Sequence, residues 1–172
     1  MTYESIKAAL ITFVQDNMAF AAPLVFAMGF AEGVPGLSLL VPSSALFLGI
    51  GAVHGAAGGS FWQVWLGAAM GAVISDCFVY MLARHYGEGV QQLPLFRRHA
   101  NWLDRGQAIL RQWGALAILG GKFTGFMRPL IPAVAGLAGM PFKLFLPASV
   151  VSSLAWAGAF LAPGYGMSWW FG

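Results

Sequence analysis

Long apolar runs, separated by short polar or glycine- and proline-rich stretches, make up most of this chain. The runs near residues 61–83 and 143–170 are long enough to cross the roughly 30 Å hydrocarbon core of a bilayer. The runs at 18–51 and 113–139 carry prolines, which bend or end helices, so neither reads as a single straight span. The pattern predicts two full membrane spans, each preceded by a Pro-broken helical hairpin.

The order of hairpin and span occurs twice, which indicates an internal repeat. An offset of 87 residues places Pro42, Gly49 and Gly71 on Pro129, Gly136 and Gly158. Because one polar segment joins the halves, and a span enters it while a hairpin leaves it, the two halves should have opposite orientations. We therefore predict an all-α integral membrane protein, an inverted repeat of two re-entrant hairpins whose tips meet near the bilayer midplane.

The predicted layout is one membrane domain over residues 1–172. It comprises an amphipathic, interfacial lead-in at 1–17, the first repeat at 18–87, a basic loop at 88–112 and the second repeat at 113–172. The lead-in lacks a cationic leader with a small-residue cleavage site, so it is not expected to be removed as a signal peptide.

Composition supports a membrane class and excludes several others. The chain has 59% hydrophobic and 9% charged residues, whereas soluble domains have roughly 25% charged residues. Nine cations against six acids are too few to suggest nucleic-acid binding. The single cysteine, Cys77, excludes an internal disulfide and a cysteine-built metal site. No metal or cofactor is predicted, and association into a homo-oligomer is left open.

The middle of the chain carries most of the basic charge. Five arginines lie between residues 84 and 111, where Glu88 and Asp104 are the acids. The positive-inside rule makes this loop cytoplasmic in a multi-pass protein of the inner or plasma membrane. Part of it should lie on the membrane as an interfacial helix. His54, in a small loop predicted at 52–60, is interpreted as a solvated residue.

Two cations and two prolines share the apolar run 121–139. A charge at the bilayer centre costs roughly 2.5 to 3.5 kcal/mol, so Lys122 and Arg128 should face protein or a wet cavity. Pro129 and Pro132 should break the helix there, as Pro42 and Ser44 should in the first half. Broken backbone at membrane depth is tolerated where it is buried or lines a cavity, so we predict an ion or anion site.

Two acids lie in the first repeat. Glu32 is either a surface carboxylate that caps the next helix or part of a buried hairpin tip that faces the cations. Asp76 shares a helix face with Tyr80 and Arg84. It either belongs to an intrahelical ladder with these residues, or takes part in proton handling or orients a cation.

These motifs resemble the DedA family, also known as the VTT or SNARE-associated Golgi protein domain. Three blocks carry the resemblance: Glu32-Gly-Val-Pro through Pro42-Ser-Ser to Gly49; Gly71-x-x-x-Ser75-Asp76-x-x-x-Tyr80-x-x-x-Arg84-x-Tyr86-Gly87; and Gly121-Lys122-Phe123-x-x-x-x-Arg128-x-x-x-Pro132-x-x-Ala135-Gly136-x-x-x-Met140, with Phe145 and Trp156 beyond.

The resemblance implies transbilayer movement of a phospholipid or of a polyprenyl phosphate such as undecaprenyl phosphate, driven by the proton motive force in bacteria and scramblase-like in eukaryotic relatives. It places the family's membrane acid on Glu32 and its two arginines on Lys122 and Arg128. This chain differs from many members in carrying Ser43-Ser44 where an acid is common, and in having lysine at 122.

The leading hypothesis is a lipid flippase. Arg128, helped by Lys122, would bind the lipid phosphate, while Glu32 and Asp76 would handle protons. The rival is a membrane lipid phosphatase, because Lys122-x5-Arg128-Pro129 is one residue shorter than a known Lys-x6-Arg-Pro phosphate clamp. That class also needs histidines after or beside the clamp, and the chain's histidines all precede it, so we expect no enzyme. A structural scaffold is the third alternative, in which the membrane charges would be dispensable.

Overall fold

The computed structural model describes residues 12, 16–36, 43–91 and 100–171. Over these residues the chain is helical, with no strand, and the prediction of an all-α protein is confirmed. Apart from Thr12, Asp16 and Asn17, the predicted lead-in lies outside the described residues. The helices are α2 (Met18–Gly33), α3 (Ser43–Ala56), α4 (Phe61–Gln91), α6 (Ala100–Trp113), α7 (Ala115–Gly121), the 3-10 helix η2 (Gly125–Leu130), α8 (Ile131–Leu137) and α9 (Phe142–Phe171).

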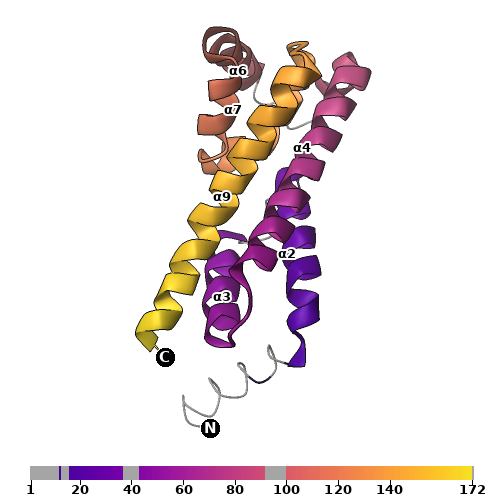
Figure 1. The fold of residues 1–172 in the computed structure, drawn as a ribbon. Helices are drawn as coiled ribbons and strands as arrows, with labels where there is room; N and C mark the ends of the chain where they lie inside the picture. Colours follow the sequence, from indigo (N-terminus) through magenta and orange to yellow (C-terminus); the bar gives the residue numbers. More distant parts are fainter. Residues whose placement is uncertain (1–11, 13–15, 37–42, 92–99, 172) are drawn as a thin grey trace.

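Two long helices, α4 and α9, run most of the height of the molecule (Figure 1). Their apolar segments Phe61–Gly87 and Phe142–Met167 have 27 and 26 residues, or about 40 Å each at 1.5 Å per residue, enough to cross a membrane. The indole Nε1 of Trp65 donates a hydrogen bond of 2.9 Å to the carbonyl oxygen of Leu154, which ties the two helices together. The two predicted spans coincide with these segments.

The shorter helices fill the two ends. Figure 1 shows α2 and α3 beside the lower part of the long helices, and α6 and α7 at the upper end. Helix α2 packs on α4 and α7 packs on α9, so each lies against the long helix of its own half. Helices α3 and α8 do the opposite, since α3 packs on α9 and α8 on α4. The two halves are therefore interlocked through exchanged helices.

Proline chemistry explains the breaks between the short helices. Helix α2 ends at Gly33 because Val34, which precedes Pro35, is extended at φ −91° and ψ 122°. In the second half, η2 contains Pro129, and Pro132 lies in the first turn of α8, where a missing N–H costs nothing. In the first half the break thus begins before the predicted position: Ser44 lies in the first turn of α3, and Pro42 lies outside the described residues.

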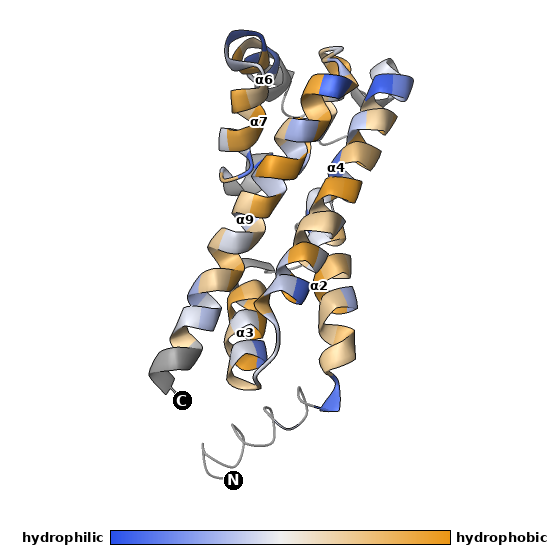
Figure 2. Cartoon of the chain, viewed as in Figure 1, coloured by the Kyte–Doolittle hydropathy of each residue, from blue (hydrophilic) through white to orange (hydrophobic). Residues whose placement is uncertain are grey.

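The outer face of α4 is apolar. Figure 2 shows hydrophobic colour along most of the long helices and hydrophilic colour at the upper ends of α4 and α6. A stripe of large side chains at every fourth position of α4 is exposed, from 37% to 63%: Trp62, Leu66, Met70, Ile74, Phe78 and Leu82. A contiguous apolar face of this kind marks a surface that something other than water covers, as is expected of a helix long enough to cross a membrane.

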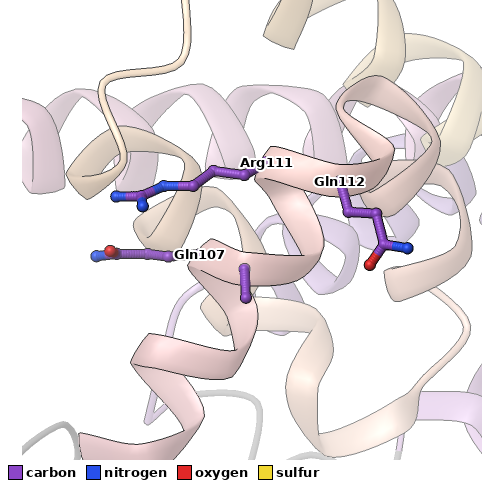
Figure 3. Close-up of a pocket in the computed structure, with 4 residues that line it drawn as sticks. Gln107, Arg111 and Gln112 are labelled. Carbon is purple, nitrogen blue, oxygen red and sulfur yellow. The ribbon is translucent and has the colours of Figure 1, made fainter.

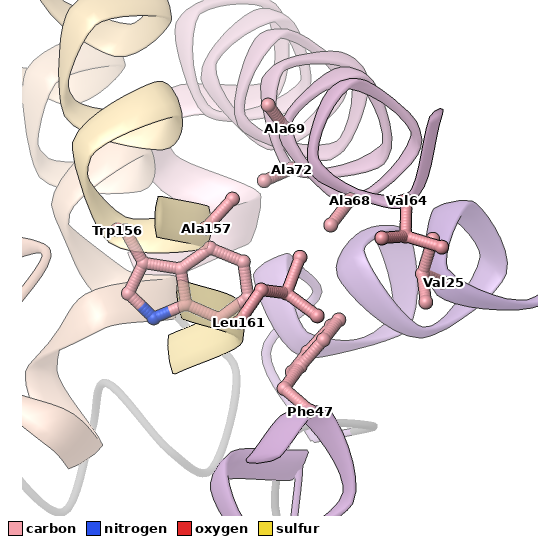
Figure 4. Close-up of a cluster of buried hydrophobic side chains, with 9 residues drawn as sticks. All are labelled: Val25, Phe47, Val64, Ala68, Ala69, Ala72, Trp156, Ala157 and Leu161. Carbon is pink, nitrogen blue, oxygen red and sulfur yellow. The ribbon is translucent and has the colours of Figure 1, made fainter. Parts of the chain in front are cut away.

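Small residues bring the helices close together inside the bundle. A Cβ added to Gly71 would lie 2.1 Å from the carbonyl oxygen of Phe26, and one added to Gly164 would lie 2.3 Å from that of Leu48. Such close backbone contacts are how membrane helices gain packing energy without a hydrophobic driving force. The core between α2, α3, α4 and α9 is shown in Figure 4 and comprises Val25, Phe47, Val64, Ala68, Ala69, Ala72, Trp156, Ala157 and Leu161.

Two expectations about the connecting segments are corrected. His54 is not a solvated loop residue: it is 2% exposed, in the last turn of α3, with its ring 6.0 Å from that of Tyr165. The small loop predicted at 52–60 is shorter because α3 continues to Ala56. The basic segment is largely helical in its described part, since α4 continues past a non-helical Gly87 and α6 follows.

Candidate functional site

An ion pair joins the two halves in the interior of the bundle. Glu32 Oε1, in the last turn of α2, contacts Arg128 NH1, in η2. The Arg128 side chain is 3% exposed and that of Glu32 is 12% exposed. The two proline-caused breaks therefore bring an acid and a cation from opposite halves together.

The guanidinium of Arg128 is unusual because it is buried without a hydrogen-bond partner among the described residues. Its Nε, NH1 and NH2 atoms are buried and have no hydrogen-bond partner within the described residues, and the same holds for Glu32 Oε2. NH1 is within ion-pair distance of Glu32 but without hydrogen-bond geometry, so the contact is electrostatic. Guanidinium is a fork of five N–H donors, and buried donors are nearly always satisfied in folded proteins. These donors are available to an anion.

Trp156 of α9 supports this cation. The Arg128 Cζ atom lies 3.6 Å from the centroid of the Trp156 ring, close enough for a cation–π interaction. Trp156 is 2% exposed and meets the ring of Phe47 edge-on at 5.1 Å, so it has little room to move. A cation over the ring face is stabilised without using its N–H donors, which stay free.

A second ion pair is arranged differently. The Nζ atom of Lys122, just after α7, contacts Asp76 Oδ2 and donates a hydrogen bond of 2.5 Å to Ser153 Oγ. Ser149 Oγ donates to the same Asp76 oxygen at 2.6 Å. Both charged side chains are 4% exposed. This pair is enclosed and hydrogen-bonded, as buried charges must be to offset their desolvation.

Gly33 brings the two pairs next to each other. A Cβ added there would lie 1.9 Å from Ser75 Oγ and 3.6 Å from Asp76 Oδ1, so the end of α2 is pressed against α4 at this level. Both Arg128 and Glu32 lie close enough to act electrostatically on Lys122. The buried site thus holds two acids and two cations, with no net charge.

The arrangement refines the predicted site. The structure brings Glu32, Lys122 and Arg128 together, but it pairs Lys122 with Asp76, 46 positions away in sequence. Of the two interpretations of Asp76, its contact with Lys122 agrees with a residue that orients a cation. The intrahelical ladder exists only in part, since Arg84 NH1 bonds to Tyr80 Oη at 2.9 Å rather than reaching Asp76.

Tyr80 and Arg84 have another partner. The Tyr80 hydroxyl donates to the carbonyl oxygen of Met140, and Arg84 NH1 donates to that oxygen at 2.9 Å. Met140 follows α8 and precedes α9. The two side chains therefore fasten the α8–α9 turn to α4, which is a structural role.

Sequence reasoning missed the polar face of α9. Ser149, Ser153 and Trp156 follow helical spacing, so they share one face, and the first two are 0% exposed. Serines at i and i+4 within an apolar span are the signal that could have found them, because a buried hydroxyl needs a polar partner.

The hollow shown in Figure 3 lies elsewhere. It has a volume of about 660 Å³ and is lined by Gln107, Ala108, Arg111 and Gln112, all on α6. Arg111 is exposed, so its charge is solvated and lacks the buried, unpartnered donors of Arg128. Within the described residues no group of three His, Cys, Asp or Glu side chains is placed to hold a metal ion.

Spanning helices with an apolar outer face, enclosing a charged site, define an integral membrane protein with an internal polar centre. The model of the VTT domain matches residues 34–166, which include α4, most of α9 and all the charged residues of this site except Glu32. The chain belongs to the VTT-domain, or DedA, family.

Its relatives are bacterial membrane proteins. The chain is 27% identical to the inner membrane protein YabI of Escherichia coli K12 over 92% of its own length and 62% of YabI. It is 25% identical to the uncharacterized membrane protein BU139 of Buchnera aphidicola, over 90% of this chain and 60% of the relative. With the inner membrane protein YohD of E. coli it shares 30% identity over 61% of this chain and 54% of YohD. The chain thus spans 54% to 62% of the length of these relatives, and no solved structure matches it.

Proposed function

We propose that this protein moves a phosphate-bearing lipid, such as a glycerophospholipid or a polyprenyl phosphate, across the bilayer, with Arg128 as the residue that binds the phosphate. The observation that carries the proposal is the buried guanidinium whose donors have no hydrogen-bond partner within the described residues. Hydrogen bonds between guanidinium and phosphate are charge-assisted and often bidentate. Phosphate would satisfy the donors that the protein leaves open.

The lipid phosphate would replace Glu32 as the partner of Arg128. Glu32 pairs with Arg128 in the described state and is the more exposed partner, at 12%. When its carboxylate takes up a proton it loses its attraction for the guanidinium, which frees Arg128 for phosphate. Proton uptake and lipid binding are coupled in this scheme. Asp76 is a second candidate for proton handling, through its contact with Lys122.

The interlocked packing supports an inverted repeat with re-entrant hairpins. Helix α2 has 16 residues and α3 has 14, about 24 and 21 Å, each too short to cross about 30 Å of hydrocarbon. In each half, one short helix packs on the long helix of the other half: α3 packs on α9, and α8 packs on α4. Movement of one hairpin against the other would open the site to alternate sides, as in other inverted-repeat transporters. We place the protein in the inner or plasma membrane and its basic segment, residues 84–111, in the cytoplasm.

We do not extend the proposal to hydrolysis. A phosphatase clamp would need Lys122 and Arg128 on the same phosphate, whereas Lys122 is held by Asp76 and Ser153. A scaffold role is also less well supported, because buried charges are costly in a membrane and are retained where they function.

The test is transport by Arg128→Lys protein in liposomes that contain fluorescent lipid. Lysine keeps the charge but cannot form the fork, so the loss of one charge-assisted hydrogen bond, about 1.5 to 3 kcal/mol, should slow transport at least about tenfold. Arg111→Lys, the same change at an exposed position, should leave the rate unchanged. Wild-type transport by correctly folded Arg128→Lys protein would rule out the phosphate-binding role.

Glu32→Gln tests the coupling. Glutamine has the size of the acid but no ionisation, so transport should lose most of its dependence on pH while lipid still binds. The measurement is the transport rate between pH 5.5 and 8.5, with and without an imposed proton gradient. An unchanged pH profile would remove Glu32 from the mechanism and leave lipid transport itself intact.

A further inference from the structure

The two buried cations differ in how they are held. Lys122 has Asp76 and Ser153 as partners, and Asp76 is in turn bonded by Ser149. Arg128 has one acid in electrostatic contact and no hydrogen bond within the described residues. A headgroup entering the site would therefore meet one available cation, because releasing Lys122 would leave Asp76 buried and unpaired.

The charges of the site set a limit on the charge of its ligand. When Glu32 is protonated, the remaining buried charges are those of Asp76, Lys122 and Arg128, a net charge of plus one. One negative charge on the ligand makes the occupied site neutral. A second negative charge would remain unpaired at membrane depth, at a cost that corresponds to roughly a hundredfold in binding.

We infer, building on the proposed function, that the site selects a phosphodiester headgroup with one negative charge over a doubly charged phosphomonoester, because Asp76 reserves Lys122 and leaves Arg128 as the available cation. The selected class comprises lipids whose phosphate is esterified on both sides. A monoester lipid would be carried only in its singly protonated form.

The protonation of the ligand makes the size of the effect measurable. A phosphomonoester has a second pKa of about 6, so about one tenth of it is singly charged at pH 7 and about one hundredth at pH 8. The preference for the diester should therefore be about tenfold at pH 7, reach about fiftyfold at pH 8, level off near a hundredfold at higher pH and nearly vanish below pH 6. Because Glu32 acts on both lipids alike, its titration cancels in the ratio of the two rates.

The experiment compares two lipids that differ by one methyl group on the phosphate. Fluorescent phosphatidic acid and fluorescent phosphatidylmethanol are placed in liposomes with the full chain, and their transbilayer rates are measured by quenching from outside between pH 5.5 and 8.5. Protein-free liposomes give the rates to subtract. The expected result is a diester preference that follows the pH dependence above. Phosphatidic acid moving as fast as phosphatidylmethanol at pH 8 would overturn the inference while leaving lipid transport established. No protein-dependent movement of either lipid would overturn both.

Asp76→Asn tests the cause of the selection. With Lys122 freed, the site offers two cations, so the preference at pH 8 should fall from about fiftyfold to less than about tenfold. Arg111→Gln, which removes an exposed cation, should leave the preference unchanged. An Asp76→Asn protein that folds and keeps the full preference would overturn the role of Asp76. If this variant does not fold, the pH dependence of the wild-type ratio still decides the inference.

Discussion

Removing the charge of Asp76 should destabilise the protein far more than removing the whole Asp76–Lys122 pair. In Asp76→Asn the side chain keeps its shape, but the ammonium of Lys122 loses its counter-ion in a site where both side chains are 4% exposed. Lys122→Met leaves the complementary problem, a buried carboxylate that keeps the hydrogen bond from the Ser149 hydroxyl but has lost its cation. In the double variant neither charge remains.

The expected magnitudes follow from the burial of the pair. Breaking a buried ion pair by removing one partner costs about 3 to 5 kcal/mol, whereas replacing both partners by neutral groups is often close to neutral. We expect each single variant to lose about 3 kcal/mol or more, and the double variant to lie within about 1 kcal/mol of wild type. Lys143→Met, the same substitution as Lys122→Met at an exposed position, should change stability by less than about 0.5 kcal/mol.

The assay is reversible unfolding of the purified chain by titration with SDS in mixed micelles, followed by tryptophan fluorescence. The free energies of unfolding of the wild type, the two single variants and the double variant form a double-mutant cycle, and its coupling energy measures the pair directly. Single variants that each lose less than about 1 kcal/mol, or a double variant whose loss is the sum of the two single losses, would show that the pair is not the enclosed contact described above.

Three further predictions concern the surroundings of the site and the orientation of the chain in the membrane. Trp156→Leu should slow lipid transport by about tenfold or more, because a desolvated cation–π contact is worth about 2 kcal/mol. Trp156→Phe should slow it less, since phenylalanine keeps an aromatic ring although indole is the best partner for a cation. Equal transport rates for both variants in the liposome assay would contradict this. Gly33→Ala should lower the free energy of unfolding by about 1 to 3 kcal/mol, since the new methyl would lie 1.9 Å from Ser75 Oγ; Ser75→Ala in the same chain should recover part of the loss, and a neutral Gly33→Ala would argue against the close approach of α2 and α4. A cysteine at Asn101, in a chain with Cys77→Ser, should resist a membrane-impermeant thiol reagent in intact cells and react after lysis, as a cytoplasmic α6 requires; labelling of intact cells would reverse the orientation.

Local features of the sequence were enough to predict the helical membrane class and the two spans. The length and apolar character of a run are local properties, which is why the predicted spans coincide with Phe61–Gly87 and Phe142–Met167, the two segments long and apolar enough to cross a membrane. A proline acts on its own backbone and on the residue before it, so the start of α8 near Pro132 follows from local chemistry, whereas the break after Gly33 lies at Pro35 and precedes the predicted one at Pro42 and Ser44. The cost of charge in a membrane pointed to Lys122 and Arg128 as residues that must lie inside the protein.

Only the tertiary structure decided which acid faces which cation. Glu32 and Asp76 could each pair with Lys122 or Arg128, and spacing along the chain does not distinguish the possibilities, because these contacts depend on how α2, α4 and the second half are packed. The same holds for Trp156, whose position over Arg128 results from the contact of α9 with η2 and α3, and for His54, which α9 covers. The physical reason is that a charge's need for a partner is a property of the residue, whereas the identity of the partner is a property of the packing. In this protein that packing gives Lys122 hydrogen-bond partners and leaves Arg128 with none among the described residues.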